Sequence, residues 1–126
     1  MKGVLAILIV LFGLVVVVVI GFLLLNEWDH RIRAPGDAKI KHQISELRTA
    51  LPPGTPRSHV YAYLDTHGMK GRYANVAPNE WNPQDNTEIA LLGTPGIVMR
   101  TRVFVQIYYL HNKVDKITER WAALGP

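Results

Sequence analysis

The sequence predicts an α+β protein, with an N-terminal transmembrane helix followed by a two-layer αα-βββ domain built on an antiparallel sheet. Three observations predict this fold. Residues 4–25 are apolar without interruption, residues 37–64 repeat apolar side chains at helical spacing, and residues 87–121 alternate apolar and polar side chains. The chain is therefore divided into a transmembrane anchor (1–25), a juxtamembrane linker (26–36), an α+β interaction domain (37–121) and a tail (122–126).

The apolar run Val4–Leu25 is long enough to cross a bilayer. Its twenty-two residues span about 33 Å as a helix, and the hydrocarbon core of a bilayer is about 30 Å thick. A secretory signal is the alternative, but signals have apolar regions of about 7–15 residues and a small-x-small cleavage site. No such cleavage site follows Leu25. The chain also has no cysteine, so it cannot be cleaved and then anchored through a lipidated cysteine. We therefore expect an uncleaved anchor.

Trp28, Arg31 and Arg33 follow the anchor closely and are expected at the membrane interface, where aromatic and basic side chains meet the headgroups. The orientation of the anchor stays open. Met-Lys before an apolar run is typical of an export signal, which places the domain outside the cytoplasm. By the positive-inside rule, however, the basic residues of segment 31–41 predict a cytoplasmic domain. The start pattern and the charge count disagree, so the residues alone do not decide the orientation.

Length and composition limit the rest of the chain to one small domain. Of the 126 residues, about 100 follow the anchor, which suits a single core. The net charge is +4, but the basic residues are spread along the sequence, so we expect no nucleic acid partner. The absence of cysteine excludes disulfides, thiol catalysis and zinc–thiolate sites.

Two helices are expected after the linker, in which Pro35-Gly36 predicts a turn. Asp37 offers an N-cap to the first helix, and Pro52-Pro53-Gly54 ends it. Apolar residues recur every three or four positions along this helix and predict one buried stripe, made of Ile40, Ile44, Leu47 and Leu51.

The second helix is expected to begin at Pro56, with Thr55 as its N-cap. Val60 and Leu64 lie one turn apart and would face the core. Gly68 suits the left-handed position that follows a helix end.

Three strands joined by short turns are expected beyond a long loop at 70–86, and such strands pair antiparallel. The loop includes a short extended piece at 73–76. In the second strand the odd-numbered positions are mostly apolar, so its even-numbered side chains should face solvent. The expected strands are 87–92, 97–110 and 114–121, with turns at 93–96 and 111–113 and a frayed tail after them.

Two parts of the sequence carry a resemblance to a known family. They are LPPGTPRSHVYAYL (51–64), and VFVQIYYL (103–110) with NKVDKI (112–117). The first is similar to the helix start, and the second to the closing hairpin, of SmpA/OmlA (BamE-like) domains. The similarity extends over residues 38–121. It implies a non-enzymatic interaction domain that faces the periplasm of a bacterium. With the expected anchor, the resemblance therefore predicts a bacterial inner-membrane protein with a periplasmic C-terminal domain. Such domains are typically lipoproteins anchored through a cysteine that this chain lacks, and none of their binding residues is matched individually.

No catalytic or metal site is predicted. Ser58, His59 and Asp65 come nearest to a nucleophile with its base, but side chains adjacent on a helix point about 100° apart. His59 and His67 lie eight residues apart, whereas two ligands on one helix share a metal at a spacing of about four. We therefore expect a protein that is not an enzyme and uses no cofactor, metal or small-molecule substrate.

Contact with another protein is the function we expect. The predicted loop after residue 70 contains arginine, tyrosine and tryptophan, the residue types most enriched at binding hot spots. The solvent-facing side of the second strand adds basic and amide side chains. The candidate contact residues are Arg72, Tyr73, Trp81, Arg100, Arg102 and Gln106.

The expected partners are the lipid bilayer and another membrane or envelope protein, to which the chain would be an accessory. Two alternatives stay open. The chain would instead be a small subunit of a membrane complex, acting mainly through its transmembrane helix. Trp81 would instead cover the core of the domain rather than contact a partner.

Overall fold

The computed structural model describes residues 2–96 and 99–124. It has a long helix α1 (Lys2–Ala50), a short helix α2 (Arg57–Thr66) and four strands. The strands form one antiparallel sheet in the order β1-β2-β3-β4. Their bounds are β1 (Tyr73–Val76), β2 (Asn86–Leu92), β3 (Arg100–Leu110) and β4 (Lys113–Leu124).

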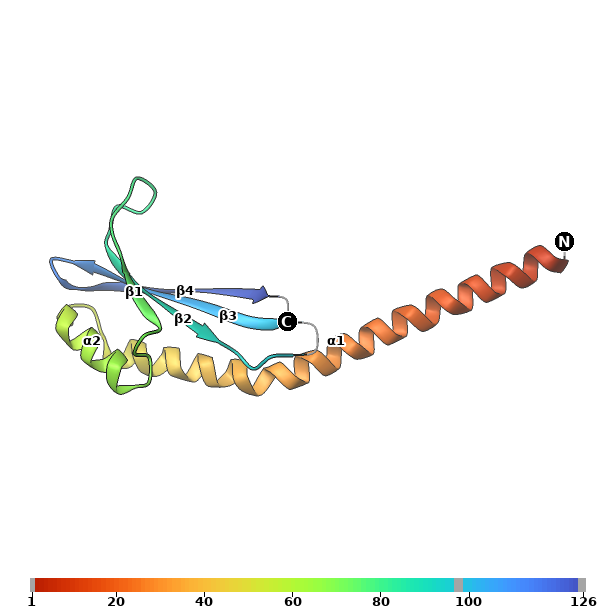
Figure 1. Ribbon diagram of the computed structural model, residues 1–126, viewed down its shortest axis with the longest axis horizontal. Coiled ribbons are helices and arrows are strands. Elements are labelled where there is room, and N and C mark those ends of the chain that lie inside the picture. Colours follow the sequence, from red (N-terminus) through yellow and green to blue (C-terminus); the bar gives the residue numbers. More distant parts are fainter. Residues whose placement is uncertain (1, 97–98, 125–126) are drawn as a thin grey trace.

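The α+β class is confirmed, while the αα-βββ arrangement is confirmed only in part. Figure 1 shows α1 and α2 on the same side of the sheet, but α2 has only ten residues and covers little of it. The sheet has four strands because the extended piece Tyr73–Val76 pairs with β2. The strand predicted from residue 97 begins at Arg100, and its first two predicted positions lie outside the described residues.

The predicted turn at Pro35-Gly36 is wrong, because α1 passes through both residues without a break. Proline removes one hydrogen bond from a helix and bends it, and Figure 1 shows α1 changing direction between its two halves. A Cβ on Gly36 would lie 2.4 Å from Thr94 Oγ1, so glycine is what lets the chain around Thr94 pack closely on the helix. Asp37 consequently lies inside α1 and is not an N-cap.

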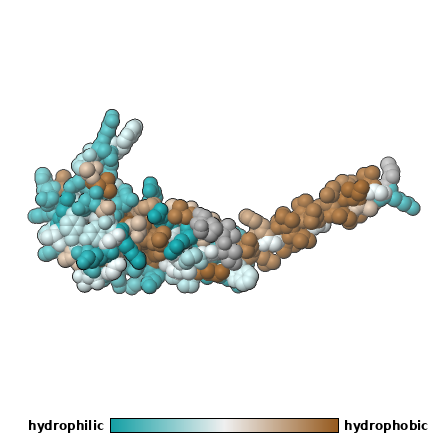
Figure 2. Space-filling view, viewed as in Figure 1, coloured by the Kyte–Doolittle hydropathy of each residue, from teal (hydrophilic) through white to brown (hydrophobic). Residues whose placement is uncertain are grey.

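The N-terminal half of α1 contacts nothing else in the described chain. Its apolar window is 0% buried, and Figure 2 shows a continuous hydrophobic rod that extends away from the domain. This helix is long and apolar enough to cross a membrane, as an anchor or as a signal sequence.

The second half of α1 builds the core of the domain, as predicted. Its stripe packs with α2 against the odd-numbered side chains of β2 and β3. All of these side chains are at most 5% exposed, namely Ile40, Ile44, Leu47, Leu51, Val60, Leu64, Met69, Ile89, Leu91, Val103, Val105, Ile107, Tyr109 and Val114.

The ends of α2 are partly as predicted. Gly68 has a φ of 77°, and the Met69 N–H donates to Leu64 O at 2.9 Å, which is the bond of a Schellman cap. Thr55 is not the N-cap, however. Its hydroxyl donates to Pro52 O, while its own carbonyl accepts from Val114 N at 2.9 Å. The start of α2 is thus fixed by the β3–β4 hairpin rather than by a cap of its own.

The hairpin between β3 and β4 closes through His111 and Asn112, whose φ angles are 53° and 60°. Two successive positive φ values define the turn whose twist matches that of paired strands, and Asn tolerates them well. The frayed tail was predicted wrongly for Ala122–Leu124, because these residues pair with Arg100–Arg102 as part of β4.

Candidate functional site

The face of the sheet that points away from α1 and α2 is not covered by any other described element. Alternation along the strands and their register bring its side chains into neighbouring rows. We call this surface the outer face. Its central members are Glu88, Ala90, Arg100, Arg102, Phe104, Gln106, Tyr108, Lys116, Thr118 and Arg120.

Cations stack on the aromatic rings of the outer face. The guanidinium carbons of Arg102 and Arg120 lie 5.1 Å and 5.0 Å from the centre of the Phe104 ring. Lys116 Nζ lies 4.9 Å from the centre of the Tyr108 ring. These distances are within the range of cation–π attraction, which holds the charged groups against the sheet.

The charges on the outer face are strongly unbalanced. Arg100, Arg102, Lys116 and Arg120 oppose a single carboxylate, Glu88, which accepts a hydrogen bond from Gln106 Nε2 at 3.3 Å. Among the described residues, no ion pair engages these four cations. Arg102 Nε is also shielded from solvent without an acceptor among those residues. Cations without carboxylates of their own are suited to binding an anionic surface.

Arg72 joins this group from the turn before β1. Its carbonyl accepts from Ala90 N at 3.1 Å, and its exposed side chain lines a hollow together with Arg100 and Arg102. The structure therefore brings together four of the candidate contact residues, namely Arg72, Arg100, Arg102 and Gln106.

Sequence reasoning missed the residues that form, together with Arg102, the cation–π contacts of the outer face, namely Phe104, Tyr108, Lys116 and Arg120. Phe104 follows the even-numbered alternation of the strand and could have been found from that pattern. Lys116 and Arg120 are opposite Tyr108 and Phe104 only because of the β3–β4 register. That register is shifted by an irregularity between Tyr108 and Tyr109, which no sequence signal marks.

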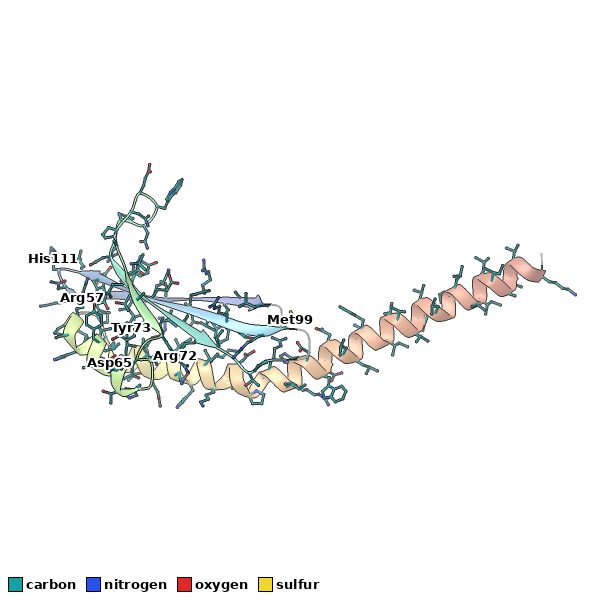
Figure 3. All side chains as sticks on the ribbon, viewed as in Figure 1. Arg57, Asp65, Arg72, Tyr73, Met99 and His111 are labelled. Carbon is teal, nitrogen blue, oxygen red and sulfur yellow. The ribbon has the colours of Figure 1, made fainter. Side chains whose placement is uncertain are left out.

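Tyr73 does not join the outer face. Its hydroxyl donates to Asp65 Oδ1 at 2.7 Å, and its ring stacks on that of Tyr61, with 6.0 Å between centroids. The hydrogen bond to Asp65 is the main cause that raises the pKa of the Tyr73 phenol, so it stays protonated as a donor. Figure 3 shows Tyr73 and Asp65 close together at the end of α2. Tyr73 therefore fastens β1 to α2.

Trp81 lies at the tip of the loop between β1 and β2, with 92% of its surface exposed. Asn79 Oδ1 accepts from the N–H groups of Trp81 and Asn82, at 2.9 Å and 2.8 Å, and so gives the tip a defined turn. The alternative that Trp81 covers the core is therefore wrong. Figure 1 shows the loop standing off the domain on the side away from α1.

The three residues expected at the membrane interface differ in their roles. Trp28 is 64% exposed, and Arg31 is exposed and pairs with Glu27 at 2.8 Å. Arg33 is turned inward instead, where its Nε donates to Asp29 Oδ2 at 2.9 Å and its Nη1 donates to Thr101 Oγ1 at 3.3 Å. Arg33 therefore contacts the domain, and its assignment to the interface stays a prediction.

Asp29 and Arg33 fasten α1 to the sheet. The side chains of this pair are 1% and 13% exposed, and a Cβ on Gly96 would lie 2.2 Å from Asp29 Oδ1. Asp29 follows the last residue of the apolar run, Leu25, by four positions, or about 6 Å of helix. Gly96 therefore meets α1 within the thickness of a headgroup layer beyond the apolar run.

No group of three or more histidine, cysteine or acidic side chains that could hold a metal occurs within residues 2–96 and 99–124. Asp65, considered above with Ser58 and His59, accepts a hydrogen bond from Tyr73 instead.

Comparisons with known proteins do not extend this picture. No protein-family model, curated protein or solved structure is significantly similar to this chain. The resemblance to SmpA/OmlA (BamE-like) domains therefore stays a prediction.

Two ion pairs of the same helical spacing allow the role of Asp29 to be tested. Asp29→Ala strands a mostly buried guanidinium, which costs about 3–5 kcal/mol, whereas Glu27→Ala removes an exposed pair worth about 0–1 kcal/mol. Urea unfolding of the full chain in micelles measures both, with tryptophan fluorescence, to which the half-buried Trp121 contributes, as the signal. Equal losses in the two variants would contradict the role given to Asp29.

Proposed function

We propose that this chain is a single-pass membrane protein that presents a small, non-enzymatic interaction domain. The outer face of its sheet binds an acidic surface of another membrane or envelope protein. The unpaired cations stacked on Phe104 and Tyr108 are the observation that carries this proposal.

The use of α1 as an uncleaved anchor is supported by its continuity. The helix passes from the apolar run into the core without a break, and Asp29, close behind the run, is buried against the domain. Cleavage after Leu25 would have to fall within this helix, in a segment that lacks a small-x-small site.

An acidic partner is supported by both charge and shape. A sheet face without a covering layer offers a broad surface, and the cation–π contacts pre-order its arginines. Opposite charge steers a partner to this surface and fixes its orientation on it. Trp81, exposed at the tip of the loop, adds a second contact with the chemistry of a hot spot.

A second candidate function rests on the membrane helix itself. Its apolar window is 0% buried, and nothing lies within 4 Å of a Cβ built on Gly13 or Gly21. A subunit that acts through this helix would lose function when Val4–Leu25 is replaced by an unrelated apolar helix. An interaction domain would tolerate that replacement.

Site-specific photocrosslinking in the native host tests the outer face. A photoreactive residue at Gln106 should give a defined protein adduct, whereas one at Ser45, on the exposed side of α1, should not. Replacing both Arg102 and Arg120 by Glu should reduce the Gln106 adduct at least tenfold, because the partner would then meet like charges. Adducts of equal yield from Ser45, or a Gln106 adduct that persists after charge reversal, would count against the proposal.

The orientation is tested by a reporter that is active only outside the cytoplasm, fused after Pro126. A periplasmic domain predicts reporter activity. A fusion from which the anchor has been deleted stays in the cytoplasm and provides the inactive control. An inactive full-length fusion would instead support the count of basic residues in segment 31–41.

A further inference from the structure

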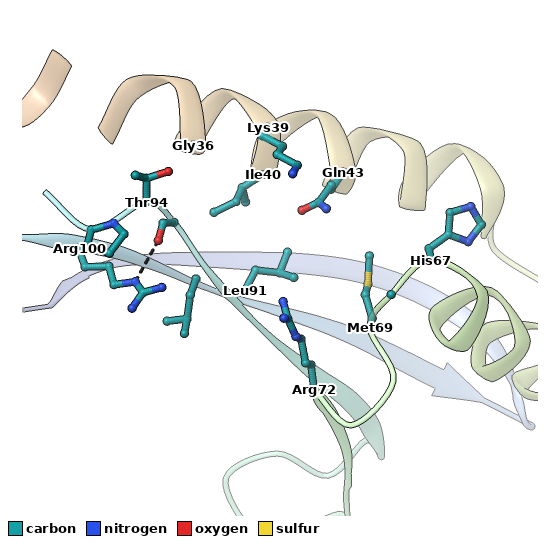
Figure 4. Close-up of a pocket in the computed structure, with 14 residues that line it drawn as sticks. Gly36, Lys39, Ile40, Gln43, His67, Met69, Arg72, Leu91, Thr94 and Arg100 are labelled. Atoms are coloured by element: carbon teal, nitrogen blue, oxygen red, sulfur yellow. Dashed lines mark hydrogen bonds between the residues drawn. The ribbon is translucent and has the colours of Figure 1, made fainter. Parts of the chain in front are cut away.

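A cavity of about 310 Å³ lies between α1 and the end of β2. Figure 4 shows α1 along one side and β2 opposite, with Arg72 entering from the turn before β1. The cavity exists because β1 ends its pairing with β2 at Ile89, which leaves residues 91–93 at an open sheet edge. This edge faces the helix across a gap that no described strand fills.

The side chains around the cavity are basic and uncharged polar, without a carboxylate. Lys39, Arg72 and Arg100 line it, and none of the fourteen lining residues is acidic. Among the described residues, none of these three cations takes part in an ion pair. Arg100 Nε donates to Gly93 O at 2.9 Å, which fixes that guanidinium at the rim. Asp37 Oδ1 lies beside Gly93, but Asp37 is not among the lining residues.

Donors that suit an oxyanion complete the lining. Gln43 carries an amide and Thr94 a hydroxyl at this site, and Ile40, Leu91 and Met69 supply apolar surface. Gly36 allows Thr94 to approach α1, and this contact closes one end of the cavity. Three cations, neutral donors and no acid are the chemistry that binds phosphate and carboxylate groups in proteins.

We propose that this cavity is an anion-binding site for a phosphate or carboxylate group, carried by a small soluble molecule or by a partner protein. The site is distinct from the outer face, although Arg72 and Arg100 border both. Lys39 and Gln43 belong to the cavity alone, and Arg120 belongs to the outer face alone.

The part of the cavity lined by Lys39 lies beyond the headgroups of the surrounding bilayer. Lys39 follows Leu25 by fourteen residues, or about 21 Å along the helix, whereas a headgroup layer is about 5–8 Å thick. The anion therefore comes from the aqueous phase or from a partner.

Titration of the full chain in discs of zwitterionic lipid tests the site, with inorganic phosphate and acetate as separate probes at constant ionic strength. Backbone amide signals of Gln43, Gly93 and Thr94 should move saturably with at least one probe, and the responding probe names the preferred group. The double variant Lys39→Gln with Arg72→Gln should bind that probe at least tenfold more weakly. Both side chains are exposed, so the domain should remain folded.

Two control variants and one control membrane separate the outcomes. Lys70→Gln removes a neighbouring exposed charge outside the cavity, and Arg120→Gln alters only the outer face, so both should bind the probe unchanged. Arg120→Gln should weaken only the partner contact of the outer face and leave probe binding in the cavity unchanged. The two proposals can therefore fail independently of each other. Discs with anionic lipid and no added probe should leave the signals in place. The proposal is overturned if neither probe saturates, if the double variant binds as before, or if anionic lipid alone moves the signals.

Discussion

The structure depends on one helix that belongs to two environments. The first half of α1 has the length and composition to cross a bilayer, and the second half supplies the apolar stripe around which the sheet packs. Because the helix does not break at Pro35, the position of the domain is set by the apolar half of the helix itself. The buried pair of Asp29 and Arg33 reinforces this, since it fastens the sheet close to the end of the apolar run.

The same arrangement explains why one side of the sheet remains uncovered. The helices available to the domain are the second half of α1 and the ten residues of α2, and both lie on one side. The other side keeps rings and cations in contact with each other and has one carboxylate among its central members. The two proposed binding surfaces both arise from this shortage of covering elements. One is the open face, and the other is the gap left where β1 stops short along β2.

Periodic patterns predicted the core well, whereas local turn signals did not. The stripe from Ile40 to Leu51 and the alternation in β3 are set by which side chains must leave water, so the sequence alone locates them. The Pro35-Gly36 pair was misjudged because tertiary contacts decide there, since the segment 93–96 packs against the helix and holds it continuous. Thr55 failed as a cap for a related reason, because the β3–β4 hairpin binds its carbonyl.

The candidate site was partly predictable, because periodic patterns locate residues within a strand but not the pairing between strands. Arg100, Arg102 and Gln106 follow from alternation in a single strand, whereas Arg120 joins them only through pairing between strands. Two of the assigned side chains use their polar atoms inside the domain. Arg33 and Tyr73 have the composition of surface contacts, but they bond to Asp29 and Asp65.

The continuity of α1 can be measured directly, because a chain without cysteine accepts spin labels at chosen positions only. Labels at Val17 and Ser45 in the full chain, held in lipid discs, are separated by twenty-eight residues, or about 42 Å of straight helix. Our account predicts one narrow distance distribution near or slightly below that value, because a bent helix remains a single rigid element. A broad distribution that extends to much shorter distances would show a flexible joint at Pro35 and contradict the account.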